Sequence, residues 1–417
     1  MTADNRPAPR PDDGSGEAAP HAPLFDSAQL SQCVQCGFCL SSCPTYEVSH
    51  LEEHGPRGRI LGMRLVQDGE ISLDHPDVVD SLVTCVQCRA CEEVCPSLVE
   101  FGPLMETARA QLLQVTPPKG RRRLAHELGY RALGRRGILR AGALGLAAAQ
   151  ATRADRLLPD RMRVRRRVRP SQVLRRLRDH RDADGPPALV FRGCVMDQLF
   201  ADVHQDTIGV LEAIGYAPTT EPAPPCCGAL HVHAGRDREA RRLAGDVVDA
   251  YHDTTGPIVV DSGGCGAAMK EYGHLLGTAR AKAVAARVVD LSEIVTADDL
   301  AGARPVPARM AFQAPCHVKN VQRLGSRPLE LLRAIPDLEL VEPDDWHLCC
   351  GSGGAYSLEH PEFAEQLLTR KADAIARTGA TEVVSGNPGC ALQLARAGLT
   401  VWHPAQLLAR ALVPGRA

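Results

Sequence analysis

The sequence predicts an α+β multidomain protein, with an N-terminal α-helical domain followed by two tandem α/β cysteine-rich repeats. Three observations lead to this fold class. The first hundred residues hold two four-cysteine runs of identical spacing, and the residues between the runs have helical patterning. Beyond residue 187, a pattern of short β-rich runs and cysteines occurs twice, with equivalent cysteines 122, 123 and 125 residues apart. A chain of 417 residues is also long for a single core.

The first 23 residues are rich in Pro, Ala, Asp and Gly, and we expect them to form a disordered tail. They contain neither the apolar core of an export signal nor a twin arginine. The chain has 16 cysteines, in spacings typical of metal sites rather than of a disulfide framework. We therefore expect the protein in the reducing cytoplasm, where thiolates stay available to bind metal.

Two cysteine runs of one form lie within residues 24–115, namely Cys33-x2-Cys36-x2-Cys39-x3-Cys43-Pro44 and Cys85-x2-Cys88-x2-Cys91-x3-Cys95-Pro96. This run is typical of bacterial proteins that hold two [4Fe–4S] clusters, where the fourth cysteine of each run ligates the other cluster. The predicted ligands are Cys33, Cys36, Cys39 and Cys95 for cluster 1, and Cys85, Cys88, Cys91 and Cys43 for cluster 2. A zinc ribbon is the alternative, but it needs only two C-x2-C pairs and leaves the third cysteine of each run without a role.

The rest of residues 24–115 is predicted to be helical. Forty-one residues separate Cys43 from Cys85, more than a compact β-rich ferredoxin fold needs. Helical patterning occupies residues 60–66, and residues 103–115 read as another helix. We therefore expect an α-helical ferredoxin domain.

Residues 116–186 form a basic connector. Between Lys119 and Arg181 there are twenty Lys and Arg against four Asp and Glu, although the whole chain has a net charge of −2. Apolar positions suggest amphipathic helices with arginine on the outer face; they are Leu124, Leu128, Tyr130, Leu133, Val173, Leu174 and Leu177. Two interpretations of these arginines remain. They form a solvated helix surface, or they dock the protein on anionic lipid or on an acidic partner. No apolar run reaches the ~20 residues of a membrane span, so membrane association would be peripheral. Nucleic-acid binding is not expected, because no aromatic residues are spaced for base stacking.

The two repeats are predicted at residues 187–305 and 306–417. In each, short β-rich runs end at a cysteine and lead into a helical stretch, which predicts a parallel sheet with ligands at the carboxyl ends of its strands. Each repeat has the form C-x31–32-C-C-G-x36–38-C. The glycine lets the backbone bend so that adjacent thiols can face one centre.

These cysteines are candidates for further metal or cluster sites: Cys194, Cys226, Cys227, Cys265, Cys316, Cys349, Cys350 and Cys390. Three alternatives remain for them, namely an iron–sulfur or dithiol centre, a zinc site with four thiolates, and reduced cysteines packed as small apolar side chains. His317 directly follows Cys316 and is either a ligand, a proton carrier or a local hydrogen-bond partner. Gly351-Ser-Gly-Gly354 lacks the spacing of a dinucleotide-binding loop.

Several stretches together resemble the iron–sulfur subunit family of bacterial glycolate oxidase (glycolate dehydrogenase). The resemblance runs from about residue 24 to the C-terminus. It is carried by Cys36-Gly-Phe-Cys-Leu-Ser-Ser-Cys-Pro-Thr-Tyr46, Gly55-Pro-Arg-Gly-Arg-Ile60, Cys88-Arg-Ala-Cys-Glu-Glu-Val-Cys-Pro-Ser97, Gly264-Cys-Gly-Ala-Ala-Met-Lys-Glu-Tyr-Gly-His274 and Leu348-Cys-Cys-Gly-Ser-Gly-Gly-Ala-Tyr356.

The resemblance implies an oxidoreductase subunit that carries electrons. It would take them from FAD-containing subunits that oxidise glycolate to glyoxylate, and pass them to a quinone or another respiratory-chain acceptor rather than to NAD or oxygen. No catalytic residue for hydride abstraction is predicted, and the chain alone is not expected to oxidise substrate, because it shows no fold for a flavin or nicotinamide.

Related functions remain as alternatives. The cysteine framework is shared with iron–sulfur subunits of lactate and glycerol-3-phosphate dehydrogenases and with heterodisulfide-reductase-like thiol–disulfide oxidoreductases. Heterodisulfide reductase relatives end each repeat in C-x2-C, whereas Cys265 and Cys390 stand alone, which disfavours an unusual double cluster in either repeat. A zinc-stabilised scaffold that merely carries the two clusters is the remaining alternative.

Overall fold

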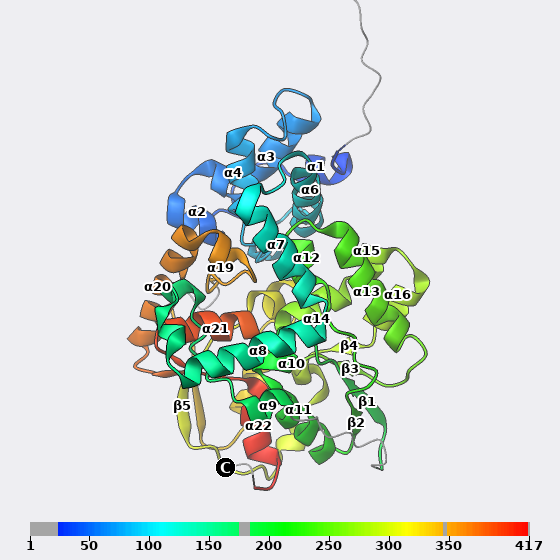
Figure 1. Cartoon of the computed structure of the whole chain (residues 1–417), viewed down its shortest axis with the longest axis vertical. Helices are drawn as coiled ribbons and strands as arrows, with labels where there is room; N and C mark the ends of the chain where they lie inside the picture. The colour runs from blue at the N-terminus through cyan, green and yellow to red at the C-terminus, as the bar shows by residue number, and fades with distance from the viewer. Residues whose placement is uncertain (1–23, 175–183, 345–347, 416–417) are drawn as a thin grey trace, which may run out of the picture.

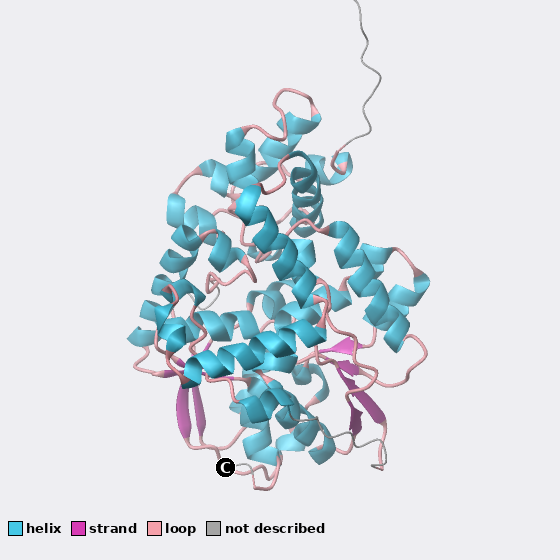
Figure 2. Ribbon diagram, in the orientation of Figure 1, coloured by secondary structure: helices cyan, strands magenta, loops and turns pink. Residues whose placement is uncertain are grey.

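The computed structural model describes residues 24–174, 184–344 and 348–415 (Figure 1). The tail predicted to be disordered and the part of the connector that includes Leu177 lie outside these residues. Helices dominate, and the strands form two small parallel sheets (Figure 2). The predicted fold class, a helical N-terminal domain before two α/β repeats, is confirmed.

Residues 24–115, here called the cluster domain, are helical wherever they have regular structure. Their elements are α1 (Ser27–Gln32), α2 (Pro44–Ser49), the 3₁₀ turn η1 (Glu52–His54), α3 (Pro56–Gln67), α4 (Pro76–Val83), α5 (Ala90–Glu93) and α6 (Phe101–Val115). Proline opens α2, α3 and α4, where its missing N–H costs nothing. The predicted helical stretches at 60–66 and 103–115 lie within α3 and α6. Ile60, Met63, Leu82, Leu104 and Met105 form the centre of its core.

The connector is also helical. It comprises α7 (Gly120–Leu133), α8 (Arg136–Ala151), the 3₁₀ turns η2 (Ala154–Leu157) and η3 (Asp160–Met162), and α9 (Pro170–Leu174). In Figure 1, α7 descends from the cluster domain and α8 crosses in front of the repeats. No helix in the described ranges is long and apolar enough to cross a membrane.

The predicted apolar face of α7 is wrong in part. Leu124 and Leu128 are exposed, and Tyr130 is the buried residue of this helix. Tyr130 packs under the guanidinium of Arg236, 4.9 Å from the ring centroid, and its carbonyl oxygen lies 3.1 Å from Nε2 of His231. Leu133 is partly buried and packs against the cluster of Cys194, Cys226 and Leu243. The helix is therefore held by Tyr130 and Leu133 rather than by a continuous leucine stripe. On α9, Val173 is buried but Leu174 is exposed.

The repeats contain the strands, and each repeat has one four-stranded sheet. The first sheet has β1 (Pro187–Val190), β2 (Ala217–Thr219), β3 (Ile258–Val259) and β4 (Val288–Val289), in the order β2-β1-β3-β4. The second has β5 (Ala308–Phe312), β6 (Leu338–Val341), β7 (Glu382–Val384) and β8 (Thr400–Trp402), in the order β6-β5-β7-β8. Every strand pair is parallel. The identical strand order establishes that the cysteine repeat is a duplicated structural unit.

Helices connect these strands in both repeats. Repeat 1 has α10 (Val195–Leu199), α11 (Ala201–Ala213), α12 (Ala229–His233), α13 (Asp237–Tyr251), α14 (Gly263–Lys270), α15 (Tyr272–Leu276), α16 (Ala279–Ala285), α17 (Leu291–Ile294) and the turn η4 (Asp298–Leu300). Repeat 2 has the π-helical turn η5 (His317–Val321), α18 (Arg327–Arg333), α19 (Tyr356–Glu359), α20 (Pro361–Arg377), α21 (Pro388–Arg396) and α22 (Pro404–Leu412).

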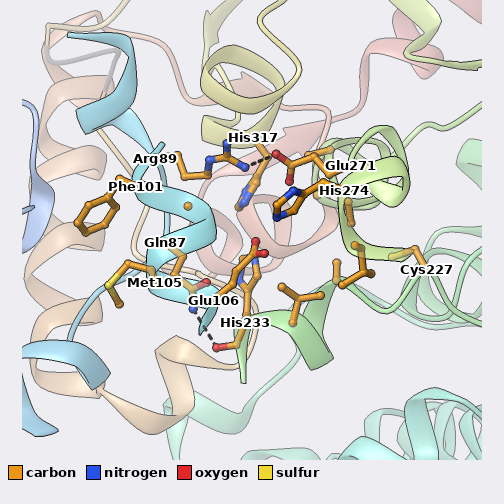
Figure 3. Close-up of a pocket in the computed structure, with 17 residues that line it drawn as sticks. Gln87, Arg89, Phe101, Met105, Glu106, Cys227, His233, Glu271, His274 and His317 are labelled. Carbon is orange, nitrogen blue, oxygen red and sulfur yellow. Dashed lines mark hydrogen bonds and ion pairs between the residues drawn. The ribbon is translucent and has the colours of Figure 1, made fainter. Parts of the chain in front are cut away.

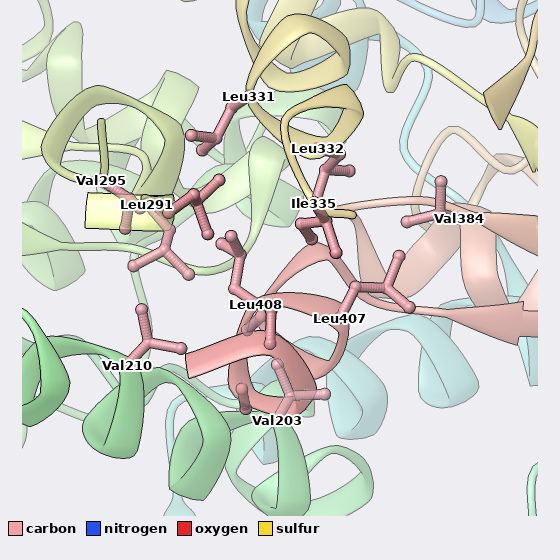
Figure 4. Packing of buried hydrophobic residues seen from close by; sticks show 14 of the residues in the cluster. Val203, Val210, Leu291, Val295, Leu331, Leu332, Ile335, Val384, Leu407 and Leu408 are labelled. Carbon is pink, nitrogen blue, oxygen red and sulfur yellow. The ribbon is translucent and has the colours of Figure 1, made fainter. Parts of the chain in front are cut away.

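One hydrophobic core joins the two repeats. Helix α11 of repeat 1 packs against the C-terminal helix α22 of repeat 2. Val203 and Val210 of α11 share this core with Leu407 and Leu408 of α22, and Leu332 of α18 closes it (Figure 4). Because burial of this apolar surface requires both repeats, their sheets have a set relation to each other.

Candidate iron–sulfur sites

The first four predicted ligands gather at one cleft of the cluster domain. Cys33, Cys36, Cys39 and Cys95, here called site A, line it together; Cys91 also borders this cleft. The second run therefore supplies its fourth cysteine to the cleft of the first run. Cys36 is exposed, and burial raises the pKa of Cys39 to about 11.

Two arginines support the loop that carries site A. Arg64 of α3 donates hydrogen bonds to the carbonyl oxygens of Leu30 and Cys33, the latter at 2.7 Å. Arg57 donates to the carbonyl oxygen of Gln35 at 3.1 Å, and its own guanidinium is held by Glu52. The carbonyls of Cys33 and Gln35 lie inside the cysteine run, so these contacts shape the loop without using its thiols.

The other four predicted ligands form site B, which comprises Cys43, Cys85, Cys88 and Cys91. All four are buried. Burial is the main cause that raises the pKa of Cys88 and Cys91 well above the usual value; the next cause is Cys316 of repeat 2 for Cys88, and Cys88 itself for Cys91. Metal binding must displace these protons, so affinity for metal rises with pH.

A buried arginine lies beside site B. Arg59 is 1 % exposed, and its Nη1 lies 3.9 Å from Sγ of Cys43. Nη2 donates to Thr45 Oγ1 at 3.1 Å, and Nε donates to the carbonyl oxygen of Ser81 at 2.7 Å. Burial opposes the charge, but Cys85 and Cys43 outweigh it and raise the pKa of Arg59. The guanidinium stays protonated next to the thiols.

Sites A and B fit [4Fe–4S] clusters by their donor sets. Each gathers four thiols from two runs, which matches one thiolate for each iron of a cubane. Across the described ranges, no three His, Cys, Asp or Glu side chains are arranged to hold a single metal ion. The thiols of site A surround an open cleft.

All eight cysteines of the two repeats line one cavity. This eight-cysteine cavity contains about 1000 Å³ of space, including its open side. The cysteines reach it from equivalent loops at the carboxyl ends of the strands, as the sequence predicts. Cys194 follows β1, Cys316 follows β5, and Cys265 and Cys390 lie at the first turns of α14 and α21. Sγ of Cys226 lies 3.7 Å from Sγ of Cys194.

The Cys-Cys-Gly turns have the backbone that the sequence predicts. Gly228 and Gly351 have φ of +83° and +79°, in the left-handed region that favours glycine. A Cβ on Gly351 would lie 2.7 Å from the carbonyl oxygen of Ala364, so a side chain there would clash. The glycine N–H donates back to a thiol of the pair, with Gly351 N 3.4 Å from Cys349 Sγ. The turn thus aims both thiols of each pair at the cavity.

The cluster domain contacts this cavity through repeat 2. Cys88 of site B shares a small apolar cluster with Cys316 and Cys349. Asn320 donates from Nδ2 to the carbonyl oxygen of Cys88 at 2.8 Å, and Tyr356 donates to the carbonyl oxygen of Thr84 at 3.0 Å. Site B therefore lies next to the repeat 2 half of the eight-cysteine cavity.

Repeat 1 contacts the cluster domain through a second cleft of about 650 Å³, drawn in Figure 3. The rings of His233 and His317 lie there with centroids 5.2 Å apart and their planes tilted by 32°, and both also line the eight-cysteine cavity. Burial, followed by the charge of Arg89, lowers the pKa of His317 to about 4. Nδ1 of His317 lies 3.6 Å from Sγ of Cys316, a local contact between neighbours in sequence.

A carboxyl group occupies the same cleft. Glu106 of α6 points into it in Figure 3, near an ion pair between Arg89 and Glu271. Burial, and next the carboxylate of Glu271, raises the pKa of Glu106 to about 8. The side chain is consequently protonated at neutral pH.

Sequence reasoning missed several of these residues. Arg59 lies in the Gly-Pro-Arg-Gly-Arg stretch that carries the resemblance, and this was the available signal for it. Glu106 and Asn320 had no such signal, because each is defined by a partner more than fifty residues away.

Family comparisons agree with this division of the chain. A model described as "4Fe-4S dicluster domain" matches residues 29–99, and a "Cysteine-rich domain" model matches residues 188–270 and 310–395. These ranges contain sites A and B and the two halves of the eight-cysteine cavity.

Individual relatives cover nearly the whole chain. A probable glycolate oxidase iron–sulfur subunit of Bacillus subtilis is 33 % identical over 89 % of this chain and 89 % of its own length. A glycolate oxidase iron–sulfur subunit of Escherichia coli is 30 % identical over 92 % of this chain and 94 % of its own. A lactate utilization protein A of Exiguobacterium is 28 % identical but covers 54 % of this chain. Since the first two match through the cluster domain and both repeats, the chain belongs to the glycolate oxidase iron–sulfur subunit family.

Proposed function

We propose that this protein is the iron–sulfur electron-transfer subunit of a glycolate-oxidising complex. One observation carries the proposal: site A, site B and the eight-cysteine cavity lie in succession within one protein. Cys88 of site B packs with Cys316 and Cys349, which line the cavity. The partner would be an FAD-containing subunit that oxidises glycolate to glyoxylate. The final acceptor would be a quinone or another component of the respiratory chain.

Sites A and B would hold the two [4Fe–4S] clusters, and the eight-cysteine cavity would hold further iron–sulfur or zinc. When bound, the clusters would supply one-electron transfer. The protein would hold the thiols in position, exclude water from the clusters and keep a positive side chain beside them. Arg57 and Arg64 bind the carbonyls of the site A loop, and Arg59 keeps a positive charge beside Cys43.

Site A is the proposed entry point for electrons. Its rim is apolar and exposed: Val34 and Phe38 both line the cleft and are each 67 % exposed, and Cys36, which lies between them in the sequence, is also exposed. Large apolar side chains around a redox site are typical of a docking face for a partner protein. The flavoprotein subunit would dock on this rim and bring its flavin close to site A.

The connector suggests a location for the complex. Its excess of sixteen positive charges between Lys119 and Arg181 would attach the protein to an acidic surface, with affinity falling as salt rises. We propose a peripheral position at the cytoplasmic face of the membrane.

Reconstitution tests the function. The chain, loaded with iron and sulfide under anaerobic conditions, is mixed with a flavoprotein partner and glycolate. Glycolate-dependent reduction of a dye and of the EPR signals of this chain is expected from the mixture, whereas the chain alone should give neither. Turnover of glycolate by this polypeptide alone would contradict the proposal.

A preference of the complex for lactate would keep the electron-transfer role but change the substrate. Phe38→Ser should slow reduction of this chain by the partner and leave its chemical reduction by dithionite unchanged. The matched control is Leu358→Ser, an exposed leucine of α19 outside the site A rim.

A further inference from the structure

Residues 152–169 form a surface loop of high positive charge, here called the arginine loop. It contains eight arginines and two aspartates. The aspartates pair inside the loop, with Asp160 Oδ1 2.7 Å from Arg165 Nη2 and Asp155 Oδ2 3.8 Å from Arg163 Nε. Exposed arginines surround them: Arg153, Arg156, Arg161, Arg165, Arg167 and Arg169.

The same loop exposes three large apolar side chains within six residues. Leu157 is 89 % exposed and Met162 is 53 % exposed, and Leu158 lies between them at 42 %. They occupy the two short 3₁₀ turns η2 and η3 and the link between these turns. A single exposed leucine is ordinary, but a cluster of three at a loop tip is typical of an interaction site.

The base of the loop is held firmly. The side-chain amide of Gln150 donates to the carbonyl oxygens of Val164 and Arg166, both at 2.9 Å, and accepts from Val168 N at 2.8 Å. Arg166 pairs with Asp202 at 2.6 Å, and its guanidinium lies 4.3 Å from the centroid of the Phe200 ring. The loop is thus anchored to repeat 1, while its tip keeps its apolar side chains in solvent.

We propose that the arginine loop docks this protein on an anionic lipid bilayer, with Leu157, Leu158 and Met162 inserted between the headgroups. Guanidinium groups bind phosphates in bidentate geometry, and arginine can keep its charge at the headgroup level while its stem covers apolar surface. Apolar tips flanked by arginine are the pattern of interfacial membrane binding. The proposed function attaches the connector to an acidic surface, and this inference names the residues that make the contact. It does not depend on the electron-transfer role.

Cosedimentation with vesicles tests the docking directly. The full chain is mixed with vesicles of phosphatidylcholine alone, or of phosphatidylcholine with phosphatidylglycerol. Binding to the anionic vesicles is expected, with loss at high salt and little binding to the neutral ones. Absence of binding to the anionic vesicles, or equal binding to both kinds, would overturn the proposal. If the loop docked on an acidic protein instead, the chain would not bind the anionic vesicles.

Two sets of variants separate insertion from general charge. The double variant Leu157→Ser, Met162→Ser should weaken binding about 10-fold or more, whereas the control Leu358→Ser should bind as the wild type does. The triple variant Arg161→Gln, Arg167→Gln, Arg169→Gln should weaken it about 100-fold. The matched triple variant at Arg121, Arg122 and Arg123, exposed on α7, removes the same charge and should have a much smaller effect. Equal losses from the two triple variants would overturn the proposal.

Insertion itself is read from tryptophan emission. Leu157→Trp should show a blue shift when anionic vesicles are added, because the indole leaves water, and Leu358→Trp should not. An unchanged spectrum of Leu157→Trp on bound vesicles would overturn the insertion. Light scattering then compares the molar mass of the wild type with that of the serine double variant. If the wild type self-associates and the variant does not, the loop is a protein interface instead. Dye reduction in the reconstituted complex measures the electron-transfer function separately.

Discussion

His204 and Asp261 form a buried pair beneath the repeat 1 half of the eight-cysteine cavity. Nδ1 of His204 lies 2.7 Å from Oδ2 of Asp261, and Thr207 donates to the same oxygen at 2.9 Å. Nε2 of His204 lies 2.9 Å from the carbonyl oxygen of Arg192. The imidazole therefore joins the segment that leads to Cys194 with the segment that leads to Cys265.

Asp261→Asn is expected to lower the free energy of unfolding by about 3–5 kcal/mol, because it leaves His204 buried without its counter-charge. Urea unfolding at pH 7 measures this. Ser385 holds the equivalent position in repeat 2, where its hydroxyl donates to Gln313 Oε1 at 2.6 Å. Ser385→Ala should cost only about 1 kcal/mol. A loss as small as this for Asp261→Asn would show that the charge pair adds little.

The same pair predicts a pH dependence of stability. Burial opposes the charge of His204, but Asp261 outweighs this effect and raises the pKa of His204. The stability that protonated His204 contributes is therefore lost as pH rises through the raised pKa. Burial likewise opposes the charge of Asp261, but His204 lowers the pKa of Asp261, so its contribution is lost as pH falls below about 4. Wild-type stability should exceed that of Asp261→Asn most between about pH 4 and pH 7. A constant difference from pH 4 to pH 9 would contradict this.

Arg59→Gln should lower the reduction potential at site B by tens of millivolts, roughly 60 mV for each tenfold change in the equilibrium constant. Removal of the buried positive charge beside Cys43 disfavours the added electron. Arg59→Lys retains a charge and should change the potential less. An EPR-monitored redox titration measures both sites. Arg57→Gln is the matched control, because Arg57 lies near Cys39 and its loss should affect site A instead.

Cys43→Ser should remove or alter the cluster at site B rather than the one at site A, although Cys43 is close in sequence to the site A cysteines. EPR of the reduced protein distinguishes the two, and iron analysis should give ~8 iron per chain for sites A and B in the wild type. Cys95→Ser is the reciprocal variant and should affect site A. Loss of the site A signal in Cys43→Ser would contradict the proposed ligand sets.

Cys227→Ser and Cys350→Ser should slow electron transfer through the complex while both [4Fe–4S] EPR signals persist. Each variant removes one thiol from the eight-cysteine cavity without touching sites A and B. Dye reduction and metal analysis of the variants are the measurements. Normal turnover with wild-type metal content would assign these cysteines a structural role, and stoichiometric zinc in the purified protein would favour the scaffold.

Glu106→Gln should stabilise the protein at alkaline pH, by about 2 kcal/mol or more above pH 8. Burial raises the pKa of Glu106 to about 8, above its value in the unfolded chain. The stability that the protonated side chain contributes to the folded state is therefore lost as pH rises towards 8. Thermal unfolding from pH 6 to pH 9 measures the difference. Glu70→Gln, at an exposed glutamate, is the control and should change little at any pH.

The local features of the site follow from the sequence alone. The ligands of one cysteine run lie a few residues apart, so their spacing alone predicts a loop around a cluster. The left-handed turns at Gly228 and Gly351 follow from the Cys-Cys-Gly pattern for the same reason. The repeated strand and cysteine pattern predicted the duplication, because each repeat encodes its own sheet. The leucines of α7 show the limit, since helical periodicity predicted the helix but not which of its faces is buried.

Which distant groups meet depends on how the domains pack. The eight cysteines of the repeats share one cavity because α11 packs on α22 and so sets the two sheets opposite each other. Site B lies beside repeat 2 because Asn320 and Tyr356 bind the backbone of the cluster domain. Such contacts join residues more than two hundred positions apart in the chain, and their partners are selected by the burial of shared apolar surface rather than by any local pattern.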